Sequence, residues 1–308
     1  MRVLITGGTG MVGSAFKNIE TDHDLILVGS KDCDLMNYDQ TFKMFAYYMP
    51  NAVIHLAAKV GGVKGNSEYV ADYFHENIMM NANVLDISRR FRVEKVVSLL
   101  STCIYPDKPT YPLTEDQIHN GEPHESNFGY AYAKRMLEVQ SRAIRNQYGL
   151  NYITAVPNNI YGPKDNFDLD NGHVIPAMIR KFYEAKKNNA DVTLWGSGQP
   201  LREFTYSEDI AKALLFLLDN YEESSPINIG TTREVSIKKV SEIISREIGF
   251  AGKIVWDTTK PEGQLKKPSS NKKFLDMCPN LCYTDLEKGL EQTCKWFADN
   301  YPNVRGVK

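Results

Sequence analysis

Short apolar runs alternate with longer amphipathic stretches along the first half of the chain. The short runs are rich in Val, Ile and Leu, and they predict β-strands at Val3–Thr6, Leu25–Val28, Ala52–Leu56, Lys95–Leu100 and Tyr152–Val156. The stretches between them have helical periodicity and predict helices at Val12–Ile19, Tyr38–Tyr48, Tyr73–Phe91 and Ala131–Tyr148. Strands that alternate with helices in this way predict a doubly wound α/β fold, in which a parallel sheet is covered on both faces.

Beyond about residue 160 the alternation breaks down, and a polar segment interrupts the chain. Further helices are predicted at Val174–Lys187, Ser207–Leu218, Ile237–Ile248 and Leu286–Asn300. Short strands are predicted at Val192–Trp195 and Ile227–Ile229, and the segment Lys260–Lys273, rich in Lys, Pro and Ser, predicts a loop. We therefore expect a second, smaller domain that is built mostly from C-terminal segments.

Composition narrows the class of protein. With 308 residues, of which 42% are hydrophobic and 24% charged, the chain has the profile of a globular protein of about two domains. The 36 basic and 38 acidic residues give a net charge of −2 without a run of like charges, which argues against a nucleic-acid partner. The longest apolar runs, such as Val96–Leu100 and Ala213–Leu218, are too short to cross a membrane. Because the sequence has no signal-peptide pattern and its 5 cysteines are scattered, we expect a cytoplasmic protein without disulfides or a metal site.

A glycine-rich loop joins the first predicted strand to the first predicted helix. Its residues are Gly7, Gly8, Thr9, Gly10, Met11, Val12 and Gly13, in a Gly-x-x-Gly-x-x-Gly pattern. Glycine lets the backbone approach a pyrophosphate closely, and a helix N-terminus offers free N–H groups and a positive field. This context is typical of a dinucleotide site in a Rossmann-type fold. The alternative is a glycine-rich turn that binds nothing.

The end of the second predicted strand bears on the choice of cofactor. Sites that prefer NAD usually carry an acidic residue there, which binds the ribose 2′-hydroxyl. This chain instead has Ser30 and Lys31, and its acids come further along. A cation at this point suits a 2′-phosphate, so we expect NADP, unless Lys31 is simply a solvated loop charge.

Tyr130 and Lys134 form a Tyr-x-x-x-Lys pattern on a predicted helix. Residues four apart share a helix face, so the ammonium is expected near the phenol, where it would lower the phenol pKa and let it exchange a proton. Ser101 ends the fourth predicted strand, at the edge where parallel sheets bind ligands. A second match, Tyr183 and Lys187, lacks this context and fits a solvated helix face.

With the glycine loop, these three residues make the chain resemble the short-chain dehydrogenase/reductase superfamily, and its length and Leu56-Ala57-Ala58 resemble the extended branch. The resemblance implies that Tyr130 is the acid/base, that Lys134 lowers its pKa and holds the cofactor ribose, and that Ser101 binds the substrate carbonyl. It also implies that the cofactor contacts the glycine loop, Ser30, Lys31 and a further set: Leu56, Ala57, Ala58, Lys134, Pro157, Asn159, Ile160 and His173.

Further motifs narrow the resemblance. They are Lys59-Val-Gly-Gly62, Ser101-Thr-Cys103, Pro157-Asn-Asn-Ile-Tyr-Gly-Pro163 and His173-Val-Ile-Pro176. They resemble the GDP-L-fucose synthases, which act on GDP-4-keto-6-deoxy-D-mannose as 3,5-epimerases and NADPH-dependent 4-reductases. The resemblance implies a GDP-sugar substrate, formation of GDP-L-fucose, and a homodimer built on the predicted helices 73–91 and 131–148.

The C4 ketone acidifies the protons at both C3 and C5, so a base can remove them. Epimerisation then needs an acid on the opposite face of the sugar, which returns the proton there. The resemblance assigns the base to Cys103 and the acid to His173, with Ser101 and Tyr130 stabilising the enolate oxygen. If the strand continued past Ser101, the side chain of Cys103 would point to the same side. Without the resemblance, Cys103 fits a small buried apolar group and His173 a helix-entry residue.

The resemblance places the GDP moiety in the second domain. The residues that it implies as substrate contacts are Ser101, Asn159, Lys181, Trp195, Arg202 and Glu262. Lys181 stands where an arginine is expected, for which the neighbouring Arg180 would compensate, and Glu262 stands where an aspartate is expected. Lys266 and Lys267 either meet the diphosphate or form a solvated charge run. We therefore expect two domains. Residues 1–162 plus about 203–232 form the domain that binds NADP, and residues of about 163–202 plus 233–308 form the domain that binds the GDP-sugar.

Two alternative functions stay open at this point. One is another nucleotide-sugar epimerase, dehydratase or reductase of the same fold. A dehydratase typically follows its active-site Thr with Asp-Glu, whereas Thr102 is followed here by Cys103 and Ile104. The other is a non-catalytic sensor that binds NADP. Such proteins commonly lose the tyrosine or the lysine, and both are present, so consumption of the cofactor would distinguish the two classes.

Overall fold

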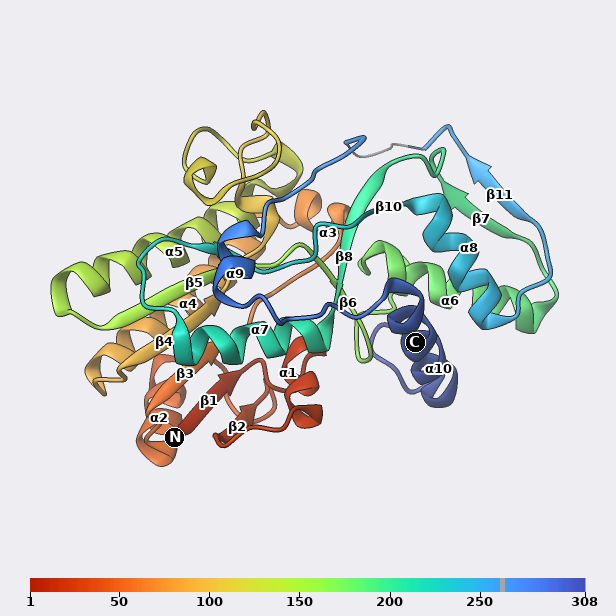
Figure 1. The fold of residues 1–308 in the computed structure, drawn as a ribbon. Helices are drawn as coiled ribbons and strands as arrows, with labels where there is room; N and C mark the ends of the chain where they lie inside the picture. Colours follow the sequence, from red (N-terminus) through yellow and green to blue (C-terminus); the bar gives the residue numbers. More distant parts are fainter. Residues whose placement is uncertain (261–263, 308) are drawn as a thin grey trace.

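A six-stranded parallel sheet organises the first part of the molecule (Figure 1). The computed structural model describes residues 1–260 and 264–307. The sheet order is β2-β1-β3-β4-β5-β9, and every pairing in it is parallel. The strands are β1 (Arg2–Thr6), β2 (Asp24–Val28), β3 (Ala52–His55), β4 (Lys95–Leu99), β5 (Asn151–Val156) and β9 (Ile227–Asn228). The doubly wound Rossmann-type α/β fold is confirmed, and the carboxyl ends of all these strands lie at one edge of the sheet.

Helices cover both faces of this sheet because successive side chains of a strand point to opposite faces. Val3 and Ile5 of β1 belong to one apolar core, and Leu4 between them belongs to the other. The first core is closed by helices α1 and α7, and Figure 1 shows α7 lying across that face of the sheet. The second is closed by α2, α4 and α5. These helices are α1 (Met11–Ala15), α2 (Tyr38–Tyr48), α4 (Val70–Arg90), α5 (Phe128–Tyr148) and α7 (Ser207–Asn220).

Most predicted helices are confirmed, and the structure differs from the prediction in where some of them begin and end. The predicted first helix is split into α1 and a 3₁₀ turn, η1 (Phe16–Asn18). The helix predicted at 73–91 is α4, which begins earlier, at Val70, and a short helix α3 (Val63–Glu68) precedes it. Three further 3₁₀ turns lie in the connection between β4 and α5: η2 (Thr102–Ile104), η3 (Glu115–Gln117) and η4 (Glu125–Asn127).

A second unit lies beyond the end of the main sheet, on the side of β6 and β8 (Figure 1). It holds a three-stranded sheet of order β10-β8-β6 and a two-stranded sheet of β11 and β7. The strands are β6 (Asn159–Tyr161), β7 (Val192–Trp195), β8 (Leu201–Tyr206), β10 (Glu234–Ser236) and β11 (Ile254–Asp257). Helices α6 (Val174–Asn188), α8 (Ile237–Ile248) and α10 (Leu286–Asn300) pack together over a third core that includes Phe182, Ile244 and Phe297. The sequence missed β6, β8, β10 and β11, because these strands are short or mix charged and apolar residues without a clear period.

The predicted loop 260–273 is irregular over its described residues 264–271 and then enters α9 (Lys272–Met277). Phe274 of α9 is fully buried in the first core, against the face that carries α7. Ser270 pairs its backbone N–H with the Leu113 carbonyl at 2.9 Å. The segment that the expected division gives to the second domain therefore returns to pack on the first.

Candidate active site

The glycine loop leaves β1 at the carboxyl edge of the sheet and lies directly against the segment that follows β3. Gly7 has φ +71°, a conformation that favours glycine, and a Cβ there would lie 2.8 Å from the backbone nitrogen of Ala57. A Cβ on Gly13 would lie 2.4 Å from the Gly7 carbonyl oxygen. Gly10 is the N-cap of α1 and offers no side-chain cap to its N–H groups. A backbone this close, with uncapped N–H groups, fits the pyrophosphate of a dinucleotide.

The turn after β2 exposes Ser30 and Lys31. The carboxylate of Asp32 folds back to accept the Gly29 N–H at 2.8 Å, and that of Asp34 accepts the Met36 N–H at 3.0 Å. Both nearby acids are thus used to hold their own turns. Lys31 is left as the exposed cation beside the loop, which fits a 2′-phosphate better than a 2′-hydroxyl.

The remaining predicted cofactor residues follow the other strands at the same edge. Leu56, Ala57 and Ala58 follow β3 and are half-buried. Pro157 follows β5 and is buried, and Asn159 donates its side-chain N–H to the Glu203 carbonyl oxygen at 2.9 Å. These segments therefore line one edge of the sheet together with the glycine loop.

Ser101 does not continue the strand, so the expected strand geometry for Cys103 is wrong. β4 ends at Leu99, and Ser101 is the N-cap of η2, where its hydroxyl oxygen accepts the Cys103 backbone N–H at 3.4 Å. Serine favours such a position because its oxygen satisfies an N–H that the turn leaves free. The turn, rather than a strand pleat, holds the Cys103 thiol beside Ser101 and Tyr130.

Tyr130 and Lys134 lie buried on α5, facing the end of β4. The Ser101 side chain lies close enough to the Tyr130 phenol to lower its pKa, although burial raises it more. Lys134 donates its ammonium to the Leu99 carbonyl oxygen at 2.7 Å, and its Nζ stands 5.9 Å from the centre of the Tyr130 ring. Burial lowers the pKa of Lys134 to about 8 and raises the pKa of the Tyr130 phenol above its ordinary value. Burial thus outweighs the expected lowering of the phenol pKa by the ammonium, and the phenol carries its proton at neutral pH.

A buried histidine that the sequence did not point to links the end of β1 to this helix. His55 of β3 shares a hydrogen bond with the Thr6 hydroxyl through Nδ1 at 2.7 Å and with the Asn81 side-chain oxygen through Nε2 at 3.0 Å. Asn81 in turn donates to the Ala133 carbonyl oxygen at 3.4 Å, next to Lys134. Burial, together with the charge of Lys134, lowers the pKa of His55 to about 4. His55 is therefore a neutral connector between β1, α4 and α5.

His173 is the N-cap of α6 and is exposed. Desolvation of its imidazole, with the charge of Arg305, lowers the pKa of His173. The loop before it reaches the first unit, where the Gly62 N–H donates to the Asn171 carbonyl at 2.9 Å. Among the residues that the structure describes, no hydrogen bond or ion pair joins His173 to Ser101, Cys103, Tyr130 or Lys134.

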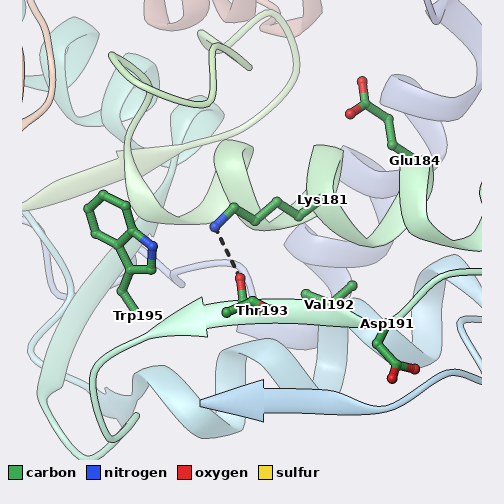
Figure 2. Close-up of a pocket in the computed structure, with 6 residues that line it drawn as sticks. All are labelled: Lys181, Glu184, Asp191, Val192, Thr193 and Trp195. Atoms are coloured by element: carbon green, nitrogen blue, oxygen red, sulfur yellow. Dashed lines mark hydrogen bonds between the residues drawn. The ribbon is translucent and has the colours of Figure 1, made fainter. Parts of the chain in front are cut away.

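Lys181 and Trp195 line a shallow pocket with Glu184, Asp191, Val192 and Thr193 (Figure 2). Lys181 Nζ donates to the Thr193 carbonyl oxygen at 3.2 Å and stands 5.8 Å from the centre of the Trp195 ring. Lys260 Nζ stands 5.7 Å from the centre of the same ring, and Trp195 is 61% exposed. An exposed indole flanked by two cations offers a flat apolar face beside positive charge.

The other residues expected to contact the substrate are Arg202 and Glu262, and Arg180 is the residue expected to replace the missing arginine at position 181. Arg202 lies in β8, half-buried, and donates to its neighbour's carbonyl at 2.6 Å. Arg180 does not compensate for the missing arginine at 181, because its guanidinium pairs with Glu184 at 2.8 Å and donates to the Gly306 carbonyl at 2.8 Å. Glu262 lies outside the described residues.

Lys267 is a site residue whose role the sequence left open. It is half-buried, and its Nζ donates to the Thr102 carbonyl oxygen at 3.0 Å, inside the turn that carries Cys103. Lys266 is exposed. The interpretation of both lysines as a solvated run is therefore wrong for Lys267. No local signal could have shown this, because the contact joins residues 165 positions apart.

Within residues 1–260 and 264–307 there is no helix with the length and apolar character that a membrane span needs. Over the same ranges no three His, Cys, Asp or Glu side chains gather in a way that could hold a metal ion.

Comparison with known proteins gives matches along nearly the whole chain. Residues 3–230 match the NAD dependent epimerase/dehydratase family. A GDP-L-fucose synthase from Dictyostelium discoideum is 47% identical, covering 98% of this chain and 97% of its own, and one from Escherichia coli is 35% identical over 99% of both. A crystal structure of a GDP-L-fucose synthetase from Naegleria fowleri bound to NADP superposes with a TM-score of 0.94 at 41% identity, covering 99% of this chain and 94% of that one. The chain belongs to the NAD dependent epimerase/dehydratase family, and within it to the GDP-L-fucose synthases.

Proposed function

We propose that the protein converts GDP-4-keto-6-deoxy-D-mannose into GDP-L-fucose, by 3,5-epimerisation followed by reduction at C4, with Ser101, Cys103, Tyr130, Lys134 and His173 as the reacting side chains. The observation that carries this proposal is the meeting of the first four of these at the carboxyl end of β4. The same edge of the sheet carries the glycine loop. A ketone held there is within reach of both the acid–base groups and the cofactor.

Epimerisation begins when the Cys103 thiolate removes a proton from the carbon next to the ketone. The Ser101 hydroxyl and the Tyr130 phenol donate hydrogen bonds to the oxygen on which the negative charge collects. His173 returns a proton from the opposite face. Burial raises the pKa of the thiol, and desolvation of the imidazole with the charge of Arg305 lowers the pKa of His173, so the free site favours a neutral pair. Groups that stabilise the thiolate are therefore part of the machinery, and Ser101, Lys267 and Lys134 all lower the thiol pKa.

Reduction uses the same phenol in a different role. NADPH, when bound, supplies the hydride for C4. Tyr130 holds its proton because burial raises its pKa, and it donates that proton to the C4 oxygen. Lys134 stands over the phenol ring and stabilises the phenolate that is left, while the glycine loop, Leu56–Ala58 and Pro157–Ile160 hold the cofactor.

The exposed indole of Trp195 supports a nucleotide site at the second unit. Trp195 is 61% exposed, and the ammonium groups of Lys181 and Lys260 lie 5.8 Å and 5.7 Å from the centre of its ring. A guanine base stacks on such a face, and the cations meet the diphosphate. Arg202 of β8 lies close enough to Lys267 to interact with it electrostatically, and it adds positive charge toward the sugar. We propose the cofactor at residues 1–162 plus about 203–232 and the GDP-sugar at about 163–202 plus 233–308, although the segment that includes α9 packs on the first unit.

Exposed apolar side chains on α4 and α5 support a homodimer. These two helices pack side by side against the sheet. Phe74 of α4 and Phe128 and Met136 of α5 are 41%, 50% and 39% exposed. A second copy would cover them. A cytoplasmic location is supported by the free cysteines, which suit a reducing compartment.

The direct test mixes the purified protein with GDP-4-keto-6-deoxy-D-mannose and NADPH. We expect loss of the nicotinamide absorbance with formation of GDP-L-fucose, identified by chromatography and NMR. Cofactor that binds without being oxidised contradicts the proposal.

Two variants separate the half-reactions in heavy water. Cys103→Ser is expected to stop deuterium entry at C3 and C5 while NADPH still binds. Tyr130→Phe is expected to lower hydride transfer about 10²-fold or more while deuterium still enters the sugar. Normal product from the first variant, or loss of exchange in the second, overturns the assignment of separate roles.

A further inference from the structure

The chain segment that carries Lys267 is tied to the site on both sides of this residue. On one side, the Leu201 N–H of β8 donates to the Leu265 carbonyl at 2.7 Å. On the other side, the Leu113 N–H donates to the Pro268 carbonyl at 2.9 Å. Pro268 also keeps Lys267 extended, since the residue before a proline avoids helical conformations. The backbone at Lys267 is therefore held between β8 and the loop that follows η2.

A buried carboxylate anchors the same segment two residues further on. Glu203 of β8 is only 3% exposed, and it accepts the Ser269 N–H at 2.9 Å and the Ser269 hydroxyl at 2.6 Å. Asn158 donates to the same carboxylate at 3.2 Å. Satisfying a buried carboxylate with three donors fixes the strand and the loop as one body. The sequence distance between Glu203 and Ser269 shows that this anchor belongs to the tertiary structure.

The anchored segment places the Lys267 ammonium at the η2 turn, which carries Cys103, the proposed base. The Lys267 ammonium donates to the Thr102 carbonyl oxygen at 3.0 Å, and Cys103 is the next residue. The thiol and the ammonium are close enough to interact electrostatically. Burial and the nearby Arg202 both disfavour the charged form of Lys267, so an ammonium here needs a negative partner to be stable. Asp107 supplies one such interaction, and a thiolate at Cys103 supplies another.

We propose that Lys267 is a positioning residue for the epimerisation, in which its ammonium stabilises the Cys103 thiolate while the sugar proton moves. This inference rests on the proposed function for the role of Cys103. In the step itself, the C–H bond next to the ketone breaks, its proton goes to the sulfur, and its electron pair delocalises onto the C4 oxygen. The sulfur changes from thiolate to thiol, and the proton that His173 returns to the other face balances the exchange. Lys267 keeps its own proton throughout.

The test measures thiolate formation directly, without substrate or cofactor. The rate of alkylation of Cys103 by iodoacetamide is followed against pH by mass spectrometry of its peptide, because Cys282 is exposed and reacts as well. Lys267→Met is expected to slow the alkylation of Cys103 about tenfold at about pH 7.5, with the curve displaced to higher pH and the same limiting rate at high pH. Lys267→Arg retains the cation and is expected to restore most of the rate.

The matched control is Lys266→Met, which removes an exposed cation from the adjacent position. Its alkylation profile is expected to stay within about twofold of the wild-type profile, since exposed charges are screened by solvent and salt. Lys267→Gln repeats the loss of charge in case the methionine variant does not fold. Unchanged alkylation profiles in folded Lys267→Met or Lys267→Gln overturn the inference. A lower limiting rate with an unmoved midpoint also overturns it, because that result indicates a structural role.

A second measurement separates this role from binding of the diphosphate. With the keto sugar, Lys267→Met is expected to lower deuterium entry at C3 and C5 about tenfold while the KM for the substrate changes little. A large rise in KM with normal exchange at saturation assigns Lys267 to the diphosphate and overturns the inference. Alkylation of Cys103 needs no turnover, so it tests the Lys267–Cys103 interaction by itself. A wild-type protein that fails to make GDP-L-fucose contradicts the proposed function and leaves the result of the alkylation test unchanged.

Discussion

The Ser101 hydroxyl oxygen accepts the backbone N–H of Cys103 at 3.4 Å, which joins the residue expected to bind the carbonyl to the one expected to remove its α-proton. The same Ser101 side chain lies close enough to Tyr130 to lower the pKa of its phenol. In the proposed function, one hydroxyl therefore serves both half-reactions. The turn that it caps, rather than the strand before it, sets the position of the thiol.

Ser101→Ala removes both of these interactions. The loss of the cap is expected to destabilise the fold by about 1 kcal/mol, because one turn N–H loses its partner. Turnover is expected to fall about 10²-fold or more, since the enolate oxygen loses a donor. Steady-state oxidation of NADPH and thermal unfolding measure the two effects, and fluorescence titration is expected to show unchanged NADPH binding. Ser101→Thr, which keeps a hydroxyl, serves as the control, and full activity in the alanine variant would refute the role.

Two glycines of the same loop are expected to respond differently to alanine. A Cβ on Gly13 would lie 2.4 Å from the Gly7 carbonyl oxygen and 2.5 Å from Gly8 Cα, so backbone must move. A Cβ on Gly10 would meet only the Gly7 carbonyl oxygen, at 3.2 Å. Gly13→Ala is expected to lower the free energy of unfolding by about 1–3 kcal/mol, and Gly10→Ala by much less. Both are expected to lose NADPH affinity, because the added methyl group or the shifted backbone blocks the pyrophosphate. Denaturant unfolding and fluorescence titration distinguish them, and equal stabilities would contradict the packing argument.

Lys31 is expected to set the preference for NADPH over NADH. It is exposed after β2, while Asp32 and Asp34 are occupied in their own turns. Lys31→Glu is expected to raise the KM for NADPH about tenfold or more and to change that for NADH far less, because one charge-assisted contact with the 2′-phosphate is lost. Lys43→Glu on the exposed side of α2 makes the same change in net charge and is expected to leave the ratio of the two cofactors intact. If the ratio of the KM values for NADPH and NADH is unchanged in the Lys31 variant, Lys31 is a solvated loop charge and does not contact the 2′-phosphate.

His55 is expected to make the fold sensitive to mild acid. Its pKa is about 4 in the folded protein, against an ordinary value of 6.5. Between these values the unfolded chain binds a proton that the folded chain does not, so stability falls as pH falls through this window and is fully present above it. From this group alone, the free energy of unfolding is expected to drop by about 2 kcal/mol between about pH 7 and about pH 5.

His55→Gln tests this dependence by urea unfolding at both pH values. The variant is expected to be less stable at neutral pH, because the bonds to Thr6 and Asn81 are weakened, but to lose about 2 kcal/mol less on acidification. Asp165 acts in the opposite direction, since burial raises its pKa to about 7, and it is present in both proteins, so the difference between them isolates His55. An identical pH dependence in the two proteins would contradict the assignment of a neutral buried imidazole.

Local signals along the sequence were sufficient for the parts of the fold that are periodic. Helices α2, α8 and α10 have the bounds that the apolar pattern predicts, and the strands of the parallel sheet are nearly continuous apolar runs. The glycine loop and the pair Tyr130 and Lys134 were also found from sequence, because their chemistry depends on fixed spacing within one turn or one helix face. Cys103 and His173 were identified only by resemblance, since neither carries a local signal of its own.

Tertiary structure alone decided how distant segments meet at the site. Lys267 reaches Thr102 across 165 residues, and Glu203 fixes Ser269 across 66. His55 joins Thr6 to Asn81 from three different elements. Such contacts form because the loop 264–271 packs against β8 and because buried polar groups must find partners. Neither cause produces a periodic pattern in the sequence. The amino-acid pattern by itself determined the sheet, its helices and the cofactor loop, whereas the charge environment of the Cys103 thiol arises only when both units are folded together.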